Sequence, residues 1–182
     1  MRDVCKFRDH VVSAEDPHIL EKNAPDHPSR AEPSSIGGDG LQWGSWFGFN
    51  DKGTTITSPA LAFLVDIFVS TPTLIPPSER LGLGKSWFPT IALAIEFKAP
   101  IPRSSTKHSS HTVGVYSTGK FMNAGRHDAW VEVWTAPCNV GEGSEIPGWR
   151  EEQVCLAVAT QMAYTVPIEV NLARGKKKDV KL

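Results

Sequence analysis

The segment most informative about the fold reads Ser58-Pro59-Ala60-Leu61-Ala62-Phe63-Leu64-Val65-Asp66-Ile67-Phe68-Val69-Ser70-Thr71-Pro72. Ser58 can cap a helix because its hydroxyl can accept a hydrogen bond from a free first-turn N–H, and Pro59 suits the first helical position. Pro72 ends the segment because proline cannot continue a helix. The residues between them are apolar on every side, which is typical of a helix enclosed by other structure. A bilayer-spanning helix needs roughly 20 residues and this one has about 12, so we predict the buried central helix of a soluble domain.

Asp66 is the only ionisable residue in this segment. Burying an unpaired carboxylate costs several kcal/mol, so Asp66 must either face a polar cleft or have a partner. One interpretation is a structural carboxylate bonded to a turn or to an arginine. The other is a functional group, because acids in such settings are frequent at functional sites.

The composition indicates one folded domain without a nucleic-acid partner. The chain has 182 residues, a formal net charge of −1 and six tryptophans, which imply large packed or ligand-lining surfaces. Cys5, Cys138 and Cys155 are far apart and form no CxxC pair, which fits neither a disulfide framework nor a zinc site. Such cysteines are typical of a reducing compartment, so we predict a cytoplasmic protein. The terminal Val180-Lys181-Leu182 only approximates the peroxisomal Ser-Lys-Leu signal, which makes a peroxisomal location the weaker alternative.

No cofactor or metal is expected from the motifs. Gly84-Lys85-Ser86 matches only the end of a phosphate-binding loop, because the GxxxxGK[ST] pattern requires glycine where this sequence has Glu79. The N-terminal residues contain no apolar signal core, and we expect no membrane span.

Five further segments are expected to be strands, from their alternation of apolar and polar residues and the turn residues between them. They cover residues 41–49, 88–97, 112–122, 127–135 and 153–166. The order of one strand, one helix and four strands predicts an α+β fold with a five-stranded antiparallel sheet wrapped around the central helix. We expect a poorly structured N-terminal segment over 1–40, with one short turn or helix over Val11–Leu20, a single domain over 41–170 and a basic tail over 171–182.

Alternation also predicts which faces of the strands meet the helix. The alanine-containing faces have room for it, so we place the helix against the face of 88–97 that bears Thr90 and the face of 153–166 that bears Gln161. The remaining apolar side chains are then expected on the outer face: Ile91, Leu93, Ile95, Phe97, Val154, Leu156 and Val158. This set exceeds the apolar patch that a soluble monomer usually exposes, which predicts an oligomer.

Asp66, Thr90 and Gln161 are therefore candidates for one site. A carboxylate can take a proton from water, and hydroxyl and amide groups can fix the direction of that water. The N-terminus of the helix could supply N–H groups to a developing oxyanion. The sequence has no Ser-His-Asp or Cys-His pattern, so hydrolysis by water is more natural than covalent catalysis. For Gln161 the alternative interpretation is a strand residue bonded to a neighbouring backbone group.

Four parts of the sequence resemble the C-terminal half of the double hot-dog acyl-CoA thioesterases, the thioesterase II type and its fungal thioesterase-like relatives. They are Ser58–Asp66, Trp87-Phe88-Pro89-Thr90-Ile91 running to Phe97-Lys98-Ala99-Pro100, Gly125-Arg126, and Cys155-Leu156-Ala157-Val158-Ala159-Thr160-Gln161. The resemblance covers roughly residues 42–166 and implies a hot-dog fold. It also implies hydrolysis of an acyl thioester on CoA or on a carrier protein, which for a fungal relative includes release of a polyketide from its synthase. It gives Asp66, Thr90 and Gln161 the role of orienting the hydrolytic water.

The chain departs from this family in having one repeat where the double enzymes have two, with the site between them. A homodimer or higher oligomer would supply the second repeat. The alternatives to an enzyme are a non-catalytic hot-dog protein that binds acyl groups or serves as a scaffold, and an inactive truncated relative. An Asp66→Asn variant distinguishes them, because only an enzyme would lose turnover.

Overall fold

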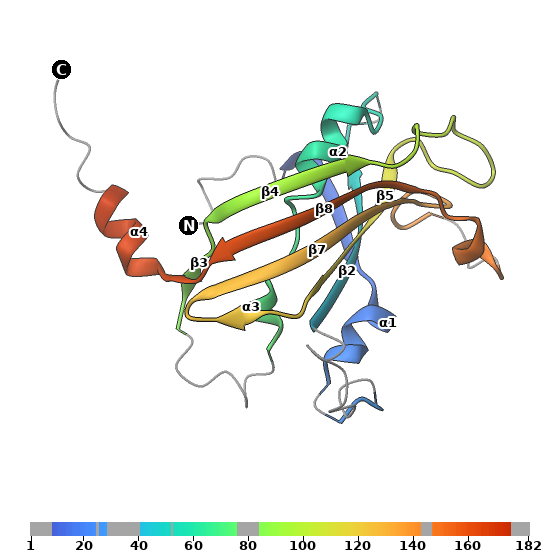
Figure 1. Ribbon diagram of the computed structural model, residues 1–182. Helices are drawn as coiled ribbons and strands as arrows, with labels where there is room; N and C mark the ends of the chain where they lie inside the picture. Colours follow the sequence, from blue (N-terminus) through green and yellow to red (C-terminus); the bar gives the residue numbers. More distant parts are fainter. Residues whose placement is uncertain are drawn as a thin grey trace, which may run out of the picture.

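The computed structural model describes residues 9–24, 26–28, 41–51, 53–75, 84–142 and 147–175, and it is dominated by one curved antiparallel sheet (Figure 1). The strand order is β1-β2-β5-β7-β8-β4, and the short β6 pairs with β7. The strands of this sheet are β1 Val11–Glu15, β2 Leu41–Phe49, β4 Thr90–Phe97, β5 Thr112–Gly119, β6 Met122–Asn123, β7 Arg126–Thr135 and β8 Cys155–Tyr164. The five strands expected from the sequence are all present, and β1 and β6 extend the sheet beyond them.

The remaining elements are short. A two-stranded sheet joins β3 (Ser86–Trp87) to β9 (Val166–Pro167). The helical segments are α1 Pro17–Leu20, η2 Glu21–Asn23, α2 Ser58–Leu64, α3 Thr71–Leu74, η4 Trp149–Glu152 and α4 Ile168–Gly175. Figure 1 shows α4 projecting away from the main sheet at the end of the chain's described part. No helix in the described ranges has the length and apolar character needed to cross a membrane.

The N-terminal segment is more ordered than the sequence suggested over residues 11–23. Where one turn or helix was expected, β1 pairs along β2 and is followed directly by α1. Asp16 begins α1 by accepting a hydrogen bond from the His18 N–H at 3.2 Å. Residues 29–40 and 176–182 lie outside the described residues, and the division of the chain at residues 40 and 170 stays a prediction.

The prediction of one long helix over 58–72 is wrong. The helix α2 has seven residues and Thr57, not Ser58, caps it by accepting from the Ala60 N–H at 3.4 Å. The last bond to a carbonyl four residues back is from Val65 N–H to Leu61 O at 3.1 Å, and the next two N–H groups, of Asp66 and Ile67, donate three residues back instead. The β-branched residues after Leu64 have low helix propensity, which favours this early stop.

Helix α2 and strand β8 contribute side chains to the same hydrophobic core. Leu61, Leu64 and Val65 are almost completely buried, and Ala157 and Ala159 of β8 belong to the same core. The expected α+β arrangement, with α2 against the alanine face of the last long strand, is confirmed. Only one side of α2 is buried, however, since Phe63 keeps 43% of its surface exposed and Asp66 is exposed.

The prediction of which β4 side chains face the helix is wrong. Leu93, Ile95 and Phe97 lie opposite Gln161, Ala159 and Ala157 of β8, so they share the helix side of the sheet. The register shifts between Thr90 and Ala92, and this bulge returns Thr90 to the helix side, opposite Ala163. Thr90 thus lies on the expected face because of this bulge, which the alternation of apolar and polar residues does not predict.

The predicted outer patch is therefore not formed as expected. Besides the β4 residues, Leu156 lies in the core with 1% exposure. The pairing of β7 with β8 passes from Ala157 directly to Cys155, and this second register shift turns Leu156 inward.

A first prediction concerns the contact of α2 with β8. Leu64→Ala should lower the free energy of unfolding by about 2–5 kcal/mol, because Leu64 is fully buried and the cavity cannot close completely. Urea denaturation measures this loss. Leu172→Ala is the control, since Leu172 is 52% exposed and its truncation should change stability little. Equal effects of the two variants would contradict the packing described.

A second prediction concerns the turn between β6 and β7. Ala124 has a φ of 51° and Gly125 a φ of 72°, and a left-handed alanine costs roughly 1–2 kcal/mol. Ala124→Asn should raise the melting temperature, because Asn-Gly is the preferred pair in two-residue hairpin turns. Ala124→Val should lower it, and the opposite order would contradict this account.

Candidate active site

The three residues proposed from the sequence lie together in the structure. The Gln161 Nε2 donates to Asp66 Oδ1 and also lies 3.2 Å from Thr90 Oγ1. These residues are 95 and 71 positions from Gln161 in the chain, and they reach it from the turn after α2 and from the edge strand β4. One amide group therefore connects the carboxylate and the hydroxyl.

Burial differs among the three side chains. Gln161 is 8% exposed, whereas Asp66 and Thr90 are exposed. The strand β8 lies between β7 and β4, so the backbone of Gln161 is held on both sides. The buried amide is thus the fixed member, and it holds a carboxylate and a hydroxyl at the surface. In the described part of the chain, no group is seen donating to Asp66 Oδ2, which is available to accept from water or substrate.

Helix α2 does not supply the expected oxyanion site beside Asp66. Asp66 follows the C-terminal end of α2, so the first-turn N–H groups lie at the opposite end of the helix. Seven residues at 1.5 Å each separate the two ends by about 10 Å. Any N–H groups that stabilise an oxyanion near Asp66 must therefore come from a segment other than the first turn of α2.

His127 is a neighbour of the site that the sequence did not single out. It lies opposite Ala163 of β8, which in turn lies opposite Thr90, so the three form one row across the sheet. His127 is 1% exposed, and its burial lowers the pKa of the imidazole, which keeps the ring neutral near pH 7. Its Nδ1 lies 3.2 Å from Thr165 Oγ1. The alternation of His127 with Ala129, Val131 and Val133 was the available signal for its burial.

The described residues contain no group of three or more His, Cys, Asp or Glu side chains arranged to hold a metal ion. The site consists of a carboxylate, an amide and a hydroxyl, and these groups can position water without a cofactor.

Comparison with known proteins agrees with this fold. The family model described as acyl-CoA thioesterase C-terminal domain matches residues 8–137, and the chain belongs to that family. The match includes Asp66 and Thr90 and ends before Gln161. A search of the curated proteins finds no significant relative.

Solved structures show the same fold at low sequence identity. An acyl-CoA thioesterase II, TesB2, from Mycobacterium marinum is 12% identical with a TM-score of 0.52, and the alignment covers 89% of this chain and 51% of that one. A protein of unknown function with a hot dog fold from Alicyclobacillus acidocaldarius is 18% identical with a TM-score of 0.47, covering 70% of this chain and 40% of that one. A putative thioesterase II from Thermobifida fusca is also 18% identical with a TM-score of 0.47, covering 88% and 47%. The family match and the TesB2 structure show that the chain has a hot-dog fold. The chain spans about half the length of these three structures.

Proposed function

We propose that the protein hydrolyses acyl thioesters, on CoA or on a carrier protein, through a water molecule oriented by Asp66, Thr90 and Gln161. The observation that carries this proposal is the Gln161 amide, which contacts both other side chains. Membership of the acyl-CoA thioesterase C-terminal domain family supports the substrate class.

The hydrogen bonds suggest a role for each group. Because the amide of Gln161 donates to both partners, Thr90 Oγ1 accepts and its own O–H is available to donate to water or to the thioester carbonyl. Asp66 takes the proton of the attacking water while the water oxygen bonds to the carbonyl carbon. When the carbon–sulfur bond breaks, that proton passes to the thiolate, and the products are a carboxylic acid and a thiol.

The exposure of the site supports a shared site between two chains. Among the described strands, β4 lies at the edge of the sheet and pairs on one side only. Leu93 and Phe97 keep 37% and 57% of their surface exposed on the same face as Gln161. Phe63, just before Asp66, is also exposed. An exposed apolar edge strand favours pairing with another chain. We therefore propose a homodimer or higher oligomer in which the second copy covers this edge.

The second candidate is a non-catalytic acyl-binding or scaffold protein, or an inactive truncated relative. The observation that favours it is the open position of the site, because Asp66 and Thr90 are both exposed. The two candidates differ in one measurable property, which is turnover.

A third prediction tests hydrolysis directly. Asp66→Asn and Gln161→Ala should each lower kcat by about 100-fold, since each removes a group that positions or deprotonates water. Release of free thiol from acyl-CoA substrates of increasing chain length, and from acyl-carrier thioesters, measures the rate. Asp26→Asn is the matched control, because Asp26 is an exposed carboxylate outside the site.

Circular dichroism must show that the variants remain folded. Full activity in both folded site variants would contradict the assignment of roles. A wild-type protein that binds acyl-CoA without releasing thiol would favour the non-catalytic alternative.

A fourth prediction tests the assembly. The wild-type protein should sediment as a dimer or larger species at micromolar concentration, and Phe97→Arg should shift it to monomer and reduce thioesterase activity. The reason is that Phe97 is the most exposed of the large apolar side chains on β4. Leu172→Arg on α4 should change neither property. A fully active wild-type monomer would contradict a shared site.

A further inference from the structure

The largest cavity described, of about 480 Å³, lies on the other face of the sheet from Gln161. Its lining includes Tyr116, Thr118, Trp130, Glu132, Trp134 and Arg150. Tyr116 lies opposite Glu132 and Thr118 opposite Trp130, while the alternate residues Val115, Val131 and Val133 point into the core. The volume falls within the roughly 300–1,000 Å³ of small-molecule sites. No step of the proposed hydrolysis uses this cavity.

The aromatic walls of the cavity are held in place by neighbouring groups. Both indole N–H groups, of Trp130 and Trp134, donate to the Glu132 carboxylate, at 2.7 and 2.8 Å. The ring of Tyr116 lies across two glycines, since a Cβ at Gly44 or Gly114 would approach it to 2.9 Å. These rings therefore need little ordering when a ligand binds.

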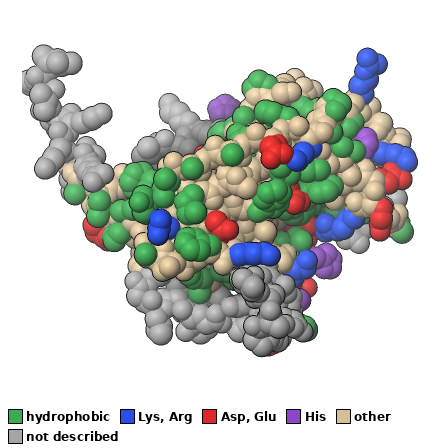
Figure 2. Space-filling view, viewed as in Figure 1, with side chains coloured by type: hydrophobic (Ala, Val, Ile, Leu, Met, Phe, Trp, Pro, Cys, Tyr) green, Lys and Arg blue, Asp and Glu red, His purple; other side chains and the backbone are tan. Residues whose placement is uncertain are grey.

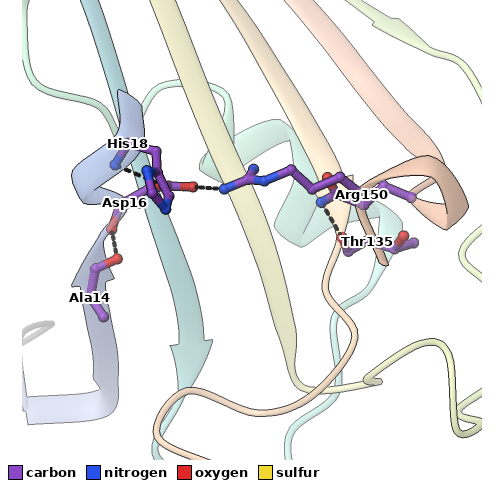
Figure 3. A network of polar contacts seen from close by, with 7 residues as sticks. Ala14, Asp16, His18, Thr135 and Arg150 are labelled. Atoms are coloured by element: carbon purple, nitrogen blue, oxygen red, sulfur yellow. Dashed lines mark hydrogen bonds and ion pairs between the residues drawn. The ribbon is translucent and has the colours of Figure 1, made fainter. Parts of the chain in front are cut away.

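An ion pair fixes the end of the cavity near α1 (Figure 3). Arg150 Nη2 lies 2.7 Å from Asp16 Oδ2, and Asp16 is 2% exposed. The Gln153 Nε2, from the same segment, donates to Thr135 O at 2.8 Å. The ion pair joins the segment after β7 to the start of α1, and the Gln153 hydrogen bond joins the same segment to the end of β7. The lining groups on this segment and on α1 therefore keep their positions.

The cavity also brings hydrogen-bond donors and acceptors together. The hydroxyl of Tyr116 interacts with the side chains of Arg150 and Gln153, which helps to position both of them at the lining. Burial raises the pKa of Tyr116 although nearby Arg150 opposes the shift, so its hydroxyl stays protonated at neutral pH. Arg150 and Lys120 can donate and the Glu132 carboxylate can accept, which favours a ligand that both donates and accepts hydrogen bonds.

The cavity lining carries charges of both signs, which disfavours a strongly ionic ligand. Asp16 pairs with Arg150, and Lys120 and Glu132 contribute one charge of each sign to the lining. On the face seen in Figure 2, acidic and basic side chains are likewise scattered among hydrophobic ones without a patch of one sign. An organic cation would meet Arg150 and Lys120, and an aromatic anion would meet Glu132.

We propose that this cavity is a second ligand site that binds a sugar ring. The apolar C–H face of a sugar can pack on Trp130, which is 41% exposed, as an apolar body packs on an aromatic ring. Its hydroxyls can donate to Glu132 and accept from Arg150 and Lys120. Hydrogen bonds to such charged groups are about twice as strong as those between neutral groups.

Titration with four probes tests this proposal: methyl β-glucoside, N-acetylglucosamine, cellobiose and maltose. Tryptophan fluorescence and calorimetry should detect at least one with a Kd of about 1 mM, which corresponds to about −4 kcal/mol. Trp130→Ala and Tyr116→Phe should each weaken binding at least tenfold. Trp87→Ala, in β3 and outside the lining, should leave binding unchanged.

Asp66→Asn should also leave sugar binding unchanged, so the result is independent of the proposed hydrolysis. Failure of all four sugars to bind at tens of millimolar would overturn the proposal. Binding of AMP or choline in their place, with loss in Trp130→Ala, would equally overturn it. Tyr116→Phe retains the ring and its packing, so loss of binding in this variant cannot be attributed to a collapsed cavity.

Discussion

The burial of α2 side chains in the core that they share with the small residues of β8 is the interaction on which the rest of the structure depends. Leu61 and Leu64 are buried against a face that carries Ala157 and Ala159. Larger residues there would push the helix outward and separate Asp66 from Gln161.

Much of the fold could be predicted from the sequence, because strong alternation and buried segments determine the long strands and the place of the helix. The end of α2 could not, since apolar residues continue to Val69 although the helix stops at Leu64. The faces of β4 could not be predicted either. Alternation assumes an uninterrupted strand, and the bulge beside Thr90 breaks that assumption. The strand β1 was missed because its five residues include only two large apolar ones.

The candidate site was predicted more completely than the sheet around it. Asp66 was singled out as the one ionisable residue in an apolar segment, and Gln161 by its place on the alanine face. Thr90 was correctly predicted to lie on the helix side of the sheet, but the prediction assumed regular alternation and not the bulge that brings it there. His127 and the cavity lined by Tyr116 and Trp130 were not predicted, because they depend on cross-strand neighbours that only the register reveals. The six tryptophans predicted large packed or ligand-lining surfaces, and of these Trp43 is packed in the core, whereas Trp130 and Trp134 line the cavity on the outer face of the sheet.

The central claim is that Asp66 and Gln161 act as one unit on the hydrolytic water. A double-mutant cycle in kcat/KM, with Asp66→Asn, Gln161→Ala and the combined variant, tests it most directly. If the two groups act together, the double variant should be little slower than the slower single variant. Losses that simply multiply, or activity that neither substitution changes, would contradict this account.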